Sequence, residues 1–268
     1  RYQKLVELSP SPALDDESRK LLWDYATRIS KIVKYSNVGT VEFLRDMAGK
    51  FYFLEINSRL QVEHPVSEFV SGIDIVNTQF EIATNGKIPF KQKDVRLSGC
   101  AIEFRVNAED PLSDFSPTTG KVEFLQIPFG PGVRVDTALQ EGMVISPYYD
   151  SLVAKLITTG TDFEQARKRA LVALDEFAVY GIETTIPFHR ELVRNDQFAR
   201  GEISTTFIET SGILKRIPRL AENSLEDQHF MIAALLLSHN QSSASSTVQP
   251  RFKKKDPNQK RSRFIDAI

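Results

Sequence analysis

The segment TVEFLRDMAGKFYFLEINSRLQVEHP, residues 40–65, contains two strand patterns followed by a run of polar side chains. Thr40–Arg45 and residues 50–57 are rich in β-branched, aromatic and other apolar residues, as strands usually are. The four residues between them include Gly49, and a connection of this length suits a hairpin turn. The segment therefore predicts an antiparallel β-hairpin that leads directly into a polar stretch.

Two acidic side chains are expected to meet across this hairpin. Pairing around the turn places Glu42 opposite Glu55, and Leu44 opposite Phe53. Like charges directly opposite each other repel, but a cation between them would be held by both. Mg²⁺ prefers oxygen ligands, often one or two carboxylates plus substrate phosphates, and Asn57 adds an amide oxygen on the same face. The hairpin thus indicates a metal site, and the alternative interpretation is the exposed polar face of an ordinary hairpin.

The polar run continues beyond the hairpin. In an extended chain alternate side chains share a face. Five polar residues would then form one row, namely Glu55, Asn57, Arg59, Gln61 and Glu63. Arg59 can hold a carboxylate-like anion through two parallel bonds, and an ionised Glu63 beside it can remove a proton. The row indicates a site for a metal-bound nucleotide and a small anion, with His64 on the opposite face as a core or capping residue.

Composition sets outer limits. The 268 residues are 41% hydrophobic and 26% charged, as in an average globular protein of about two domains. A net charge of −1 argues against a dedicated nucleic-acid binder. The single cysteine, Cys100, excludes an intrachain disulfide and a cysteine-rich zinc site. No run approaches the roughly 20 apolar residues of a membrane span. We expect a protein of the cytoplasm or, in a eukaryote, the mitochondrial matrix, and a chain taken from a longer one, because residue 1 is not Met.

Helical spacing predicts helices over residues 15–35, 74–84, 163–177 and 186–193. Strand patterns cover residues 96–107, 121–127, 132–137 and 151–158. Further on, residues 225–238 could form an amphipathic helix, and residues 251–263 carry seven Lys or Arg against one acid. Such a basic end is usually solvated and disordered, although it can dock on an anion.

Four blocks carry a family resemblance. LEINSRLQVEHPVSE, residues 54–68, resembles the signature of biotin carboxylases within the ATP-grasp superfamily. AIEFRVNAEDP, residues 101–111, and SPYYDSLVAKL, residues 146–156, are similar to motifs of the same family, as is the opening RYQKLVE. The resemblance covers residues 1–212.

The resemblance implies an α+β fold. Residues 1–94 would be the carboxyl-terminal part of an ATP-grasp domain, and residues 95–212 the biotin carboxylase carboxyl-terminal domain. Residues 213–268 would be a tail, partly disordered and basic at its end. The family's glycine-rich lid, adenine hinge and amino-terminal domain would precede Arg1. The fragment alone is therefore expected to be inactive.

The resemblance also implies residue roles. Glu42, Glu55 and Asn57 match the family's Mg²⁺ or Mn²⁺ ligands, and the two glutamates also meet ATP. The pocket for bicarbonate and biotin, including the catalytic groups, would be formed by Lys4, Arg59, Val62, Glu63 and Arg105. Glu63 would be the base and Arg105 would stabilise the enolate of biotin. From the residues alone, the alternative interpretation is that Arg105 forms a partly buried ion pair with Glu103 or Glu109. Arg134 matches an arginine of the family's dimer interface.

The implied activity is that of an ATP-dependent carbon–nitrogen ligase that carboxylates biotin with bicarbonate. No Met-Lys-Met biotinylation site is present, so biotin would arrive on a carrier protein or domain. A second copy of the chain and a carboxyltransferase subunit are further expected partners, whereas nucleic acid and membrane are not. The final acceptor, acetyl-CoA, propionyl-CoA or pyruvate, stays open. The alternatives are another ATP-grasp ligase, or a truncated, non-catalytic module that keeps the dimer surface.

Overall fold

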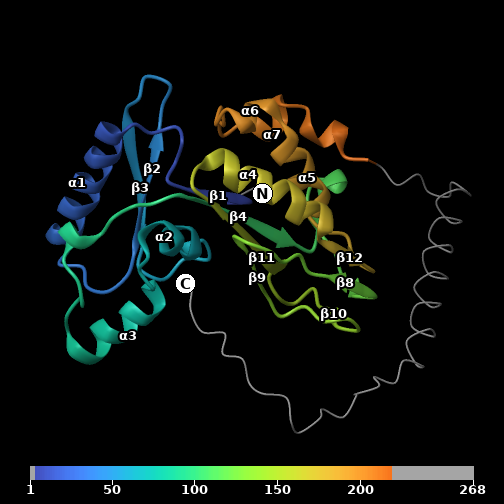
Figure 1. Cartoon of the computed structure of the whole chain (residues 1–268), viewed down its shortest axis with the longest axis horizontal. Coiled ribbons are helices and arrows are strands. Elements are labelled where there is room, and N and C mark those ends of the chain that lie inside the picture. Colours follow the sequence, from blue (N-terminus) through green and yellow to red (C-terminus); the bar gives the residue numbers. More distant parts are fainter. Residues whose placement is uncertain (1–3, 219–268) are drawn as a thin grey trace, which may run out of the picture. The chain divides into compact units, whose positions relative to one another are not determined.

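An antiparallel sheet lies at the centre of the structure, a computed structural model that describes residues 4–218 (Figure 1). Its four strands lie in the order β1 (Val6–Ser9), β4 (Cys100–Asn107), β11 (Leu152–Gly160) and β9 (Val133–Thr137). The strands predicted over 132–137 and 151–158 are confirmed, and the strand predicted over 96–107 begins only at Cys100. The edge strand β1 was not predicted, because four residues are too short for a clear pattern.

The two faces of this sheet differ in chemistry. On one face Ile102, Phe104 and Leu156 are fully buried in a core that also includes apolar residues of α4 (Phe163–Glu176) and α5 (Ile186–Arg194). These helices confirm the predictions over 163–177 and 186–193. On the other face the alternate residues of β4 face α2 (His64–Ser71), where Ala101 packs against Val66 and Val70. One face is thus the apolar core, and the other carries charged groups.

The predicted hairpin is present. β2 (Thr40–Arg45) pairs antiparallel with β3 (Phe51–Asn57), and Glu42 lies opposite Glu55 as predicted. The predicted pairing of Leu44 with Phe53 is wrong, because Phe43 faces Phe53 and Leu44 faces Tyr52. A bulge after Glu42 leaves one residue of β3 without a partner, which shifts the register toward the tip.

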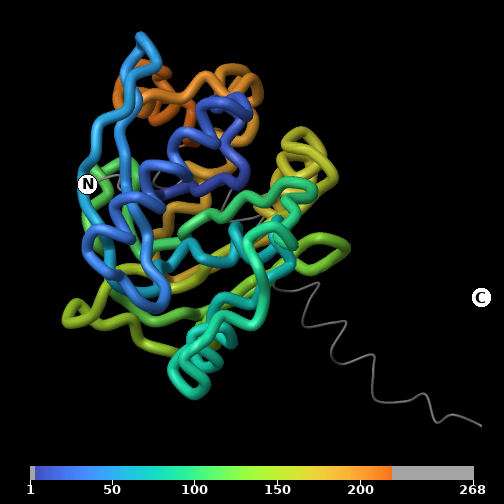
Figure 2. The backbone as a smooth tube through the Cα atoms, turned by 90° about the vertical axis from the view of Figure 1, so that its left-hand side faces the viewer, coloured from blue at the N-terminus to red at the C-terminus, as the bar shows by residue number. Residues whose placement is uncertain are grey.

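Two helices accompany the hairpin in sequence. α1 (Asp16–Ile32) begins where Asp15 accepts a hydrogen bond from Ser18 N at 2.8 Å, and it runs alongside the hairpin in Figures 1 and 2. The rings of Tyr25 and Phe43 lie 6.2 Å apart at this contact. α3 (Ile75–Asn85) ends at Gly86, whose φ of 66° is the left-handed conformation of a helix C-cap. The helices predicted over 15–35 and 74–84 are confirmed.

The strand predicted over 121–127 is divided between two small sheets. β7 (Gly120–Lys121) pairs with β10 (Val144–Ile145), and β8 (Phe124–Gln126) pairs with β12 (Ala178–Tyr180). The remaining short elements are β5 (Glu109–Asp110), β6 (Ser116–Pro117), η1 (Gln92–Asp94), η2 (Pro111–Ser113), α6 (Asp196–Ala199), α7 (Phe207–Thr210) and η3 (Ile213–Arg216). Within residues 4–218, no helix is both long and apolar enough to cross a membrane. The predicted helix over 225–238 and the basic segment 251–263 lie outside the described residues.

Candidate active site

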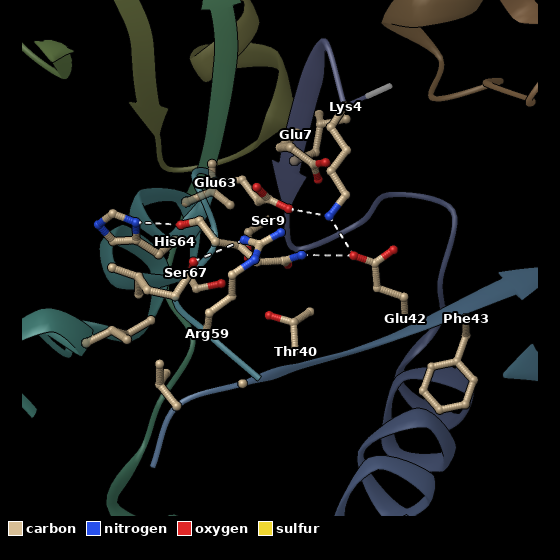
Figure 3. A pocket seen from close by; sticks show the side chains of 17 residues that line it. Lys4, Glu7, Ser9, Thr40, Glu42, Phe43, Arg59, Glu63, His64 and Ser67 are labelled. Atoms are coloured by element: carbon tan, nitrogen blue, oxygen red, sulfur yellow. Dashed lines mark hydrogen bonds and ion pairs between the residues drawn. The ribbon is translucent and has the colours of Figure 1, made fainter. Parts of the chain in front are cut away.

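Lys4 connects two of the glutamates that the sequence singles out (Figure 3). Its Nζ donates to Glu42 Oε1 at 2.6 Å and to Glu63 Oε1 at 2.7 Å. The other oxygen of Glu63, Oε2, accepts a hydrogen bond from Arg105 Nη2 at 2.7 Å. Four of the predicted site residues therefore meet, although they come from four separate places in the chain.

These contacts control the charges of the cluster. Burial opposes ionisation of Glu63, but its bonds to Lys4 and to its own backbone N–H, and the nearby Arg105, together lower its pKa. Burial also opposes the charge of Lys4, and the hydrogen bonds to Glu42 and Glu63 outweigh this and raise its pKa. Hydrogen bonds from Lys4 and Gln61 lower the pKa of Glu42. Both carboxylates are consequently ionised at neutral pH.

Glu42 and Glu55 converge on the side chain of Asn57. Asn57 Nδ2 lies 2.9 Å from Glu42 Oε1 and 3.1 Å from Glu55 Oε1, so one atom is within hydrogen-bond distance of both carboxylates. That atom lies where a cation shared by the two glutamates would sit. Since Nδ2 now fills this place, a cation could enter only if the Asn57 side chain moved aside and turned its Oδ1 toward it. Two carboxylates and one amide oxygen would then be the donor set, which suits a hard divalent cation whose remaining ligands are water or substrate oxygens.

This set is small. Among residues 4–218 no group of three or more His, Cys, Asp or Glu is placed to hold a metal ion. Glu42 Oε1 also accepts from Lys4 and, at 2.9 Å, from Gln61 Nε2. A cation here would thus rely on two carboxylates and one amide, and would share Glu42 with Lys4.

The prediction that residues 55–63 form one extended row of polar side chains is wrong. β3 ends at Asn57, and α2 begins at His64 after a turn at Val62 and Glu63. Pro65 in the first turn of α2 has a fixed φ that suits a helix start, and this competes with the extended conformation. The turn still directs Glu63 to Lys4, so the predicted side chains meet by a different route.

A pocket of about 420 Å³ opens beside the cluster. Its polar lining includes Lys4, Glu7, Thr40, Glu42, Arg59 and Glu63. Arg59 reaches into it from the loop after β3, and Nη1 donates to Leu60 O at 3.3 Å (Figure 3). His64 also borders the pocket, and its Nδ1 makes a 2.8 Å hydrogen bond with Gln61 O at the start of α2. The volume and the mixed charges suit a small polar ligand.

Two side chains bind the backbone carbonyl of Arg105. Its carbonyl accepts from Thr185 Oγ1 at 2.9 Å and hydrogen-bonds to His189 Nε2 at 2.7 Å. His189 is fully buried, and burial lowers its pKa to about 4, so the ring is neutral. The ion pair of Arg105 is with Glu63, which excludes the alternative pairings with Glu103 and Glu109 as its main contact.

Several neighbours of the site were not predicted. Glu7 lies opposite Glu103 across β1 and β4, and burial raises the pKa of each to about 7. Lys155 Nζ donates to the carbonyl of Val62 at 2.9 Å. The signal that could have found them was a charged residue inside an otherwise apolar strand, as in LVAKLI, because such a residue needs a buried partner.

Comparison with known proteins agrees with these features. Residues 103–210 match the model of the biotin carboxylase C-terminal domain. Residues 1–91 match the model of the carbamoyl-phosphate synthase L chain, ATP-binding domain.

Two similar curated proteins are biotin carboxylase 1 of Bacillus subtilis (strain 168) and the biotin carboxylase of a Nostoc species. The first is 47% identical over 215 residues, which cover 80% of this chain and 48% of that protein. The second is 46% identical over 209 residues, which cover 78% of this chain and 47% of that protein. The chain thus spans about half the length of these two relatives.

Among solved structures, the biotin carboxylase subunit of pyruvate carboxylase superposes with a TM-score of 0.79 at 42% identity, covering 82% of this chain and 49% of that one. The biotin carboxylase domain dimer of Hydrogenobacter thermophilus 2-oxoglutarate carboxylase, in complex with MgADP, ADP and bicarbonate, has a TM-score of 0.77 at 40% identity. It covers 80% of this chain and 47% of that one. The predicted α+β fold, an ATP-grasp portion followed by a carboxylase domain, is confirmed, and the chain belongs to the biotin carboxylase family.

Proposed function

We propose that this chain is part of a biotin carboxylase, which uses ATP and bicarbonate to carboxylate biotin on a carrier protein or domain. The observation that carries the proposal is the Glu63 carboxylate, held between Lys4 and Arg105 beside the paired glutamates of the hairpin. The site thus combines an ionised base, two cations and a set of oxygen donors suited to a metal. These are the groups that ATP-dependent carboxylation of biotin requires.

Glu42, Glu55 and Asn57 are the proposed metal ligands, and the two glutamates also face the nucleotide phosphates. Mg²⁺ or Mn²⁺ bound there would offset the negative charge of the phosphoryl group during transfer. Lys4, which already contacts Glu42 and Glu63, would stand between the phosphate and the bicarbonate. Its raised pKa keeps the ammonium charged for this purpose.

Glu63 is the proposed base for bicarbonate. Its lowered pKa keeps the carboxylate ionised and able to accept a proton at neutral pH. Arg59 supplies a guanidinium for the anion from the other side of the pocket, and the backbone at Val62 adds a donor. Bicarbonate deprotonated by Glu63 can then attack the γ-phosphorus of ATP, which forms carboxyphosphate and releases ADP. Carboxyphosphate decays to CO2 and phosphate.

Arg105 is proposed to act at the later step, in which the biotin ureido nitrogen loses its proton to the released phosphate and attacks CO2. Deprotonated biotin carries negative charge on its ureido oxygen, and a guanidinium next to the base can stabilise it. Two bonds fix the backbone carbonyl of Arg105, and the bond to Glu63 orients its guanidinium.

Residues 1–94 and 95–212 are proposed as the two domains, and the homodimer, the biotin carrier and the carboxyltransferase as partners. The dimer is supported by the dimeric relative. A cytoplasmic or mitochondrial-matrix location remains a prediction.

The test is phosphate release from ATP by the complete subunit that contains these residues, with free biotin as acceptor. Release should depend on bicarbonate and Mg²⁺, and carboxybiotin should accumulate. Bicarbonate-independent ATP cleavage, or none, would contradict the proposal.

A further inference from the structure

Lys155 lies in the middle of the charged face of the sheet. It is on β11, directly opposite Arg105 of β4 on one side and Asp136 of β9 on the other. Its side chain is only 13% exposed. Since a lysine loses much rotamer freedom and hydration when it is buried, this ammonium must be compensated by its neighbours.

Two acids hold the ammonium laterally. Lys155 Nζ lies 3.6 Å from Asp136 Oδ2 and 3.9 Å from Glu103 Oε2. Glu103 is fully buried, and within residues 4–218 neither of its oxygens accepts a hydrogen bond, so its polar contact there is the ion pair with Lys155, and Arg105 acts on it from farther away. Asp136 is fixed in turn by Arg134, which donates to both of its oxygens at 2.7 and 2.9 Å.

The hydrogen bond of Lys155 points to the active site. Its Nζ donates to Val62 O at 2.9 Å, across 93 residues of sequence. Val62 and Glu63 share a planar peptide unit, so fixing the Val62 carbonyl also fixes the N–H and the Cα position of Glu63. Glu63 at the N-cap of α2 makes no side-chain cap bond, and its carboxylate is instead bound by Lys4 and Arg105, so the bond from Lys155 acts on the backbone of the turn.

We propose that Lys155 is a positioning residue for Glu63. It holds the turn between β3 and α2 against the central sheet, so that the Glu63 carboxylate stays between Lys4 and Arg105. This role rests on the proposed function, since it matters for catalysis only if Glu63 is the base for bicarbonate. Lys155 itself contacts no substrate in this scheme.

The experiment compares the parent with the Lys155→Met variant, which keeps the apolar stem and removes the charge, both within the complete subunit. The kcat/KM for bicarbonate in ATP cleavage should fall roughly 10- to 100-fold, the usual cost of displacing a catalytic group by about 1 Å. KM for MgATP should change much less, because Glu42 and Glu55 lie on the hairpin and Glu42 is linked to Glu63 only through Lys4. Lys155→Arg should recover part of the loss. Lys168→Met, at a lysine that is 68% exposed, is the matched control and should behave as the parent.

Removal of Lys155 takes away the ion pair of buried Glu103 and leaves only the more distant Arg105, which destabilises the fold of the single variant. Lys155→Met combined with Glu103→Gln removes the Glu103 charge without restoring the bond to Val62. The double variant should fold and remain as slow with bicarbonate as the single one. Parental kcat/KM in either variant, or an equal loss for MgATP and bicarbonate, would overturn the positioning role. A parent enzyme without bicarbonate-dependent ATP cleavage would instead overturn the proposed function itself.

Discussion

Glu63 has two oxygens that contact different cations, Lys4 and Arg105. Glu63 and Arg105 are assigned to successive steps of the reaction, because Glu63 acts on bicarbonate and Arg105 acts later, on deprotonated biotin. In the complete subunit, Glu63→Gln should therefore suppress both bicarbonate-dependent ATP cleavage and biotin carboxylation. Arg105→Ala should reduce carboxylation more than ATP cleavage, by roughly 100-fold as for loss of an oxyanion donor. Phosphate release and carboxybiotin formation, measured side by side, decide this. Equal losses in both rates for Arg105→Ala would refute separate roles.

Glu103 should make stability depend on pH. Its pKa is raised from 4.5 to about 7 in the folded chain by burial, so folding favours its protonated form. The stability that this proton provides is complete below pH 4.5 and is lost as the pH rises through about 7. Glu103→Gln, which stays neutral, should remove the contribution of Glu103 to this loss, on the order of 2 kcal/mol, and leave the contribution of Glu7, whose pKa burial also raises to about 7. Denaturant titrations of the 268-residue chain and the variant at pH 5 and pH 8 measure it. An identical pH dependence for both proteins would show that Glu103 does not titrate in this range.

At the scale of single elements, the hairpin carries the proposed metal site. Glu42→Gln and Glu55→Gln should each raise the Mg²⁺ concentration needed for half-maximal turnover and lower the maximal rate, because each removes one carboxylate ligand. Glu68→Gln, on α2 and outside the proposed ligand set, is a suitable control of the same charge change. A metal titration unchanged in both hairpin variants would remove the site from this element.

The strand β9 carries the proposed dimer contact. Arg134 is 45% exposed, is bound to Asp136 and lies 5.8 Å from the ring centre of Phe69. Arg134→Glu would place a negative charge beside Asp136 on the proposed interface, so sedimentation should show more monomer than for the parent. Arg200→Glu changes the charge equally at another exposed ion pair, with Glu202, and should leave association unchanged. The same association constant for all three proteins would exclude Arg134 from the interface.

Long elements with a clear period could be predicted from the sequence, and so could the facing of Glu42 and Glu55. The bulge after Glu42 could not, because strand periodicity does not record an unpaired residue. Nor could the start of α2 at His64, where an alternating polar pattern competes with the preference of Pro65 for a helix start. The partners of Arg105 and Lys155 depend on contacts between distant strands, and local sequence does not encode which strands become neighbours.

At the scale of the whole molecule, the chain corresponds to about half of its relatives. We expect the 268-residue polypeptide alone to bind MgATP only weakly and to show no bicarbonate-dependent ATP cleavage. The physical reason is that the proposed metal ligands would meet only the phosphates, and the chain covers about half the length of the Bacillus subtilis and Nostoc biotin carboxylases. Calorimetry with MgATP tests the prediction, and micromolar binding would contradict it. Titration of the complete subunit under the same conditions provides the positive control.

The two unlike faces of β4 have a consequence for how genes of this kind can change. Phe104 belongs to the apolar core, and its neighbour Arg105 belongs to the charged site. Inserting or deleting a single codon within this strand would exchange the two faces, sending arginine into the core and phenylalanine into the site. Point substitutions can be absorbed one position at a time, but a change of length here damages folding and chemistry together. Length variation should accordingly accumulate at places such as the hairpin tip, where Met47 is fully exposed, and be purged from residues 100–107.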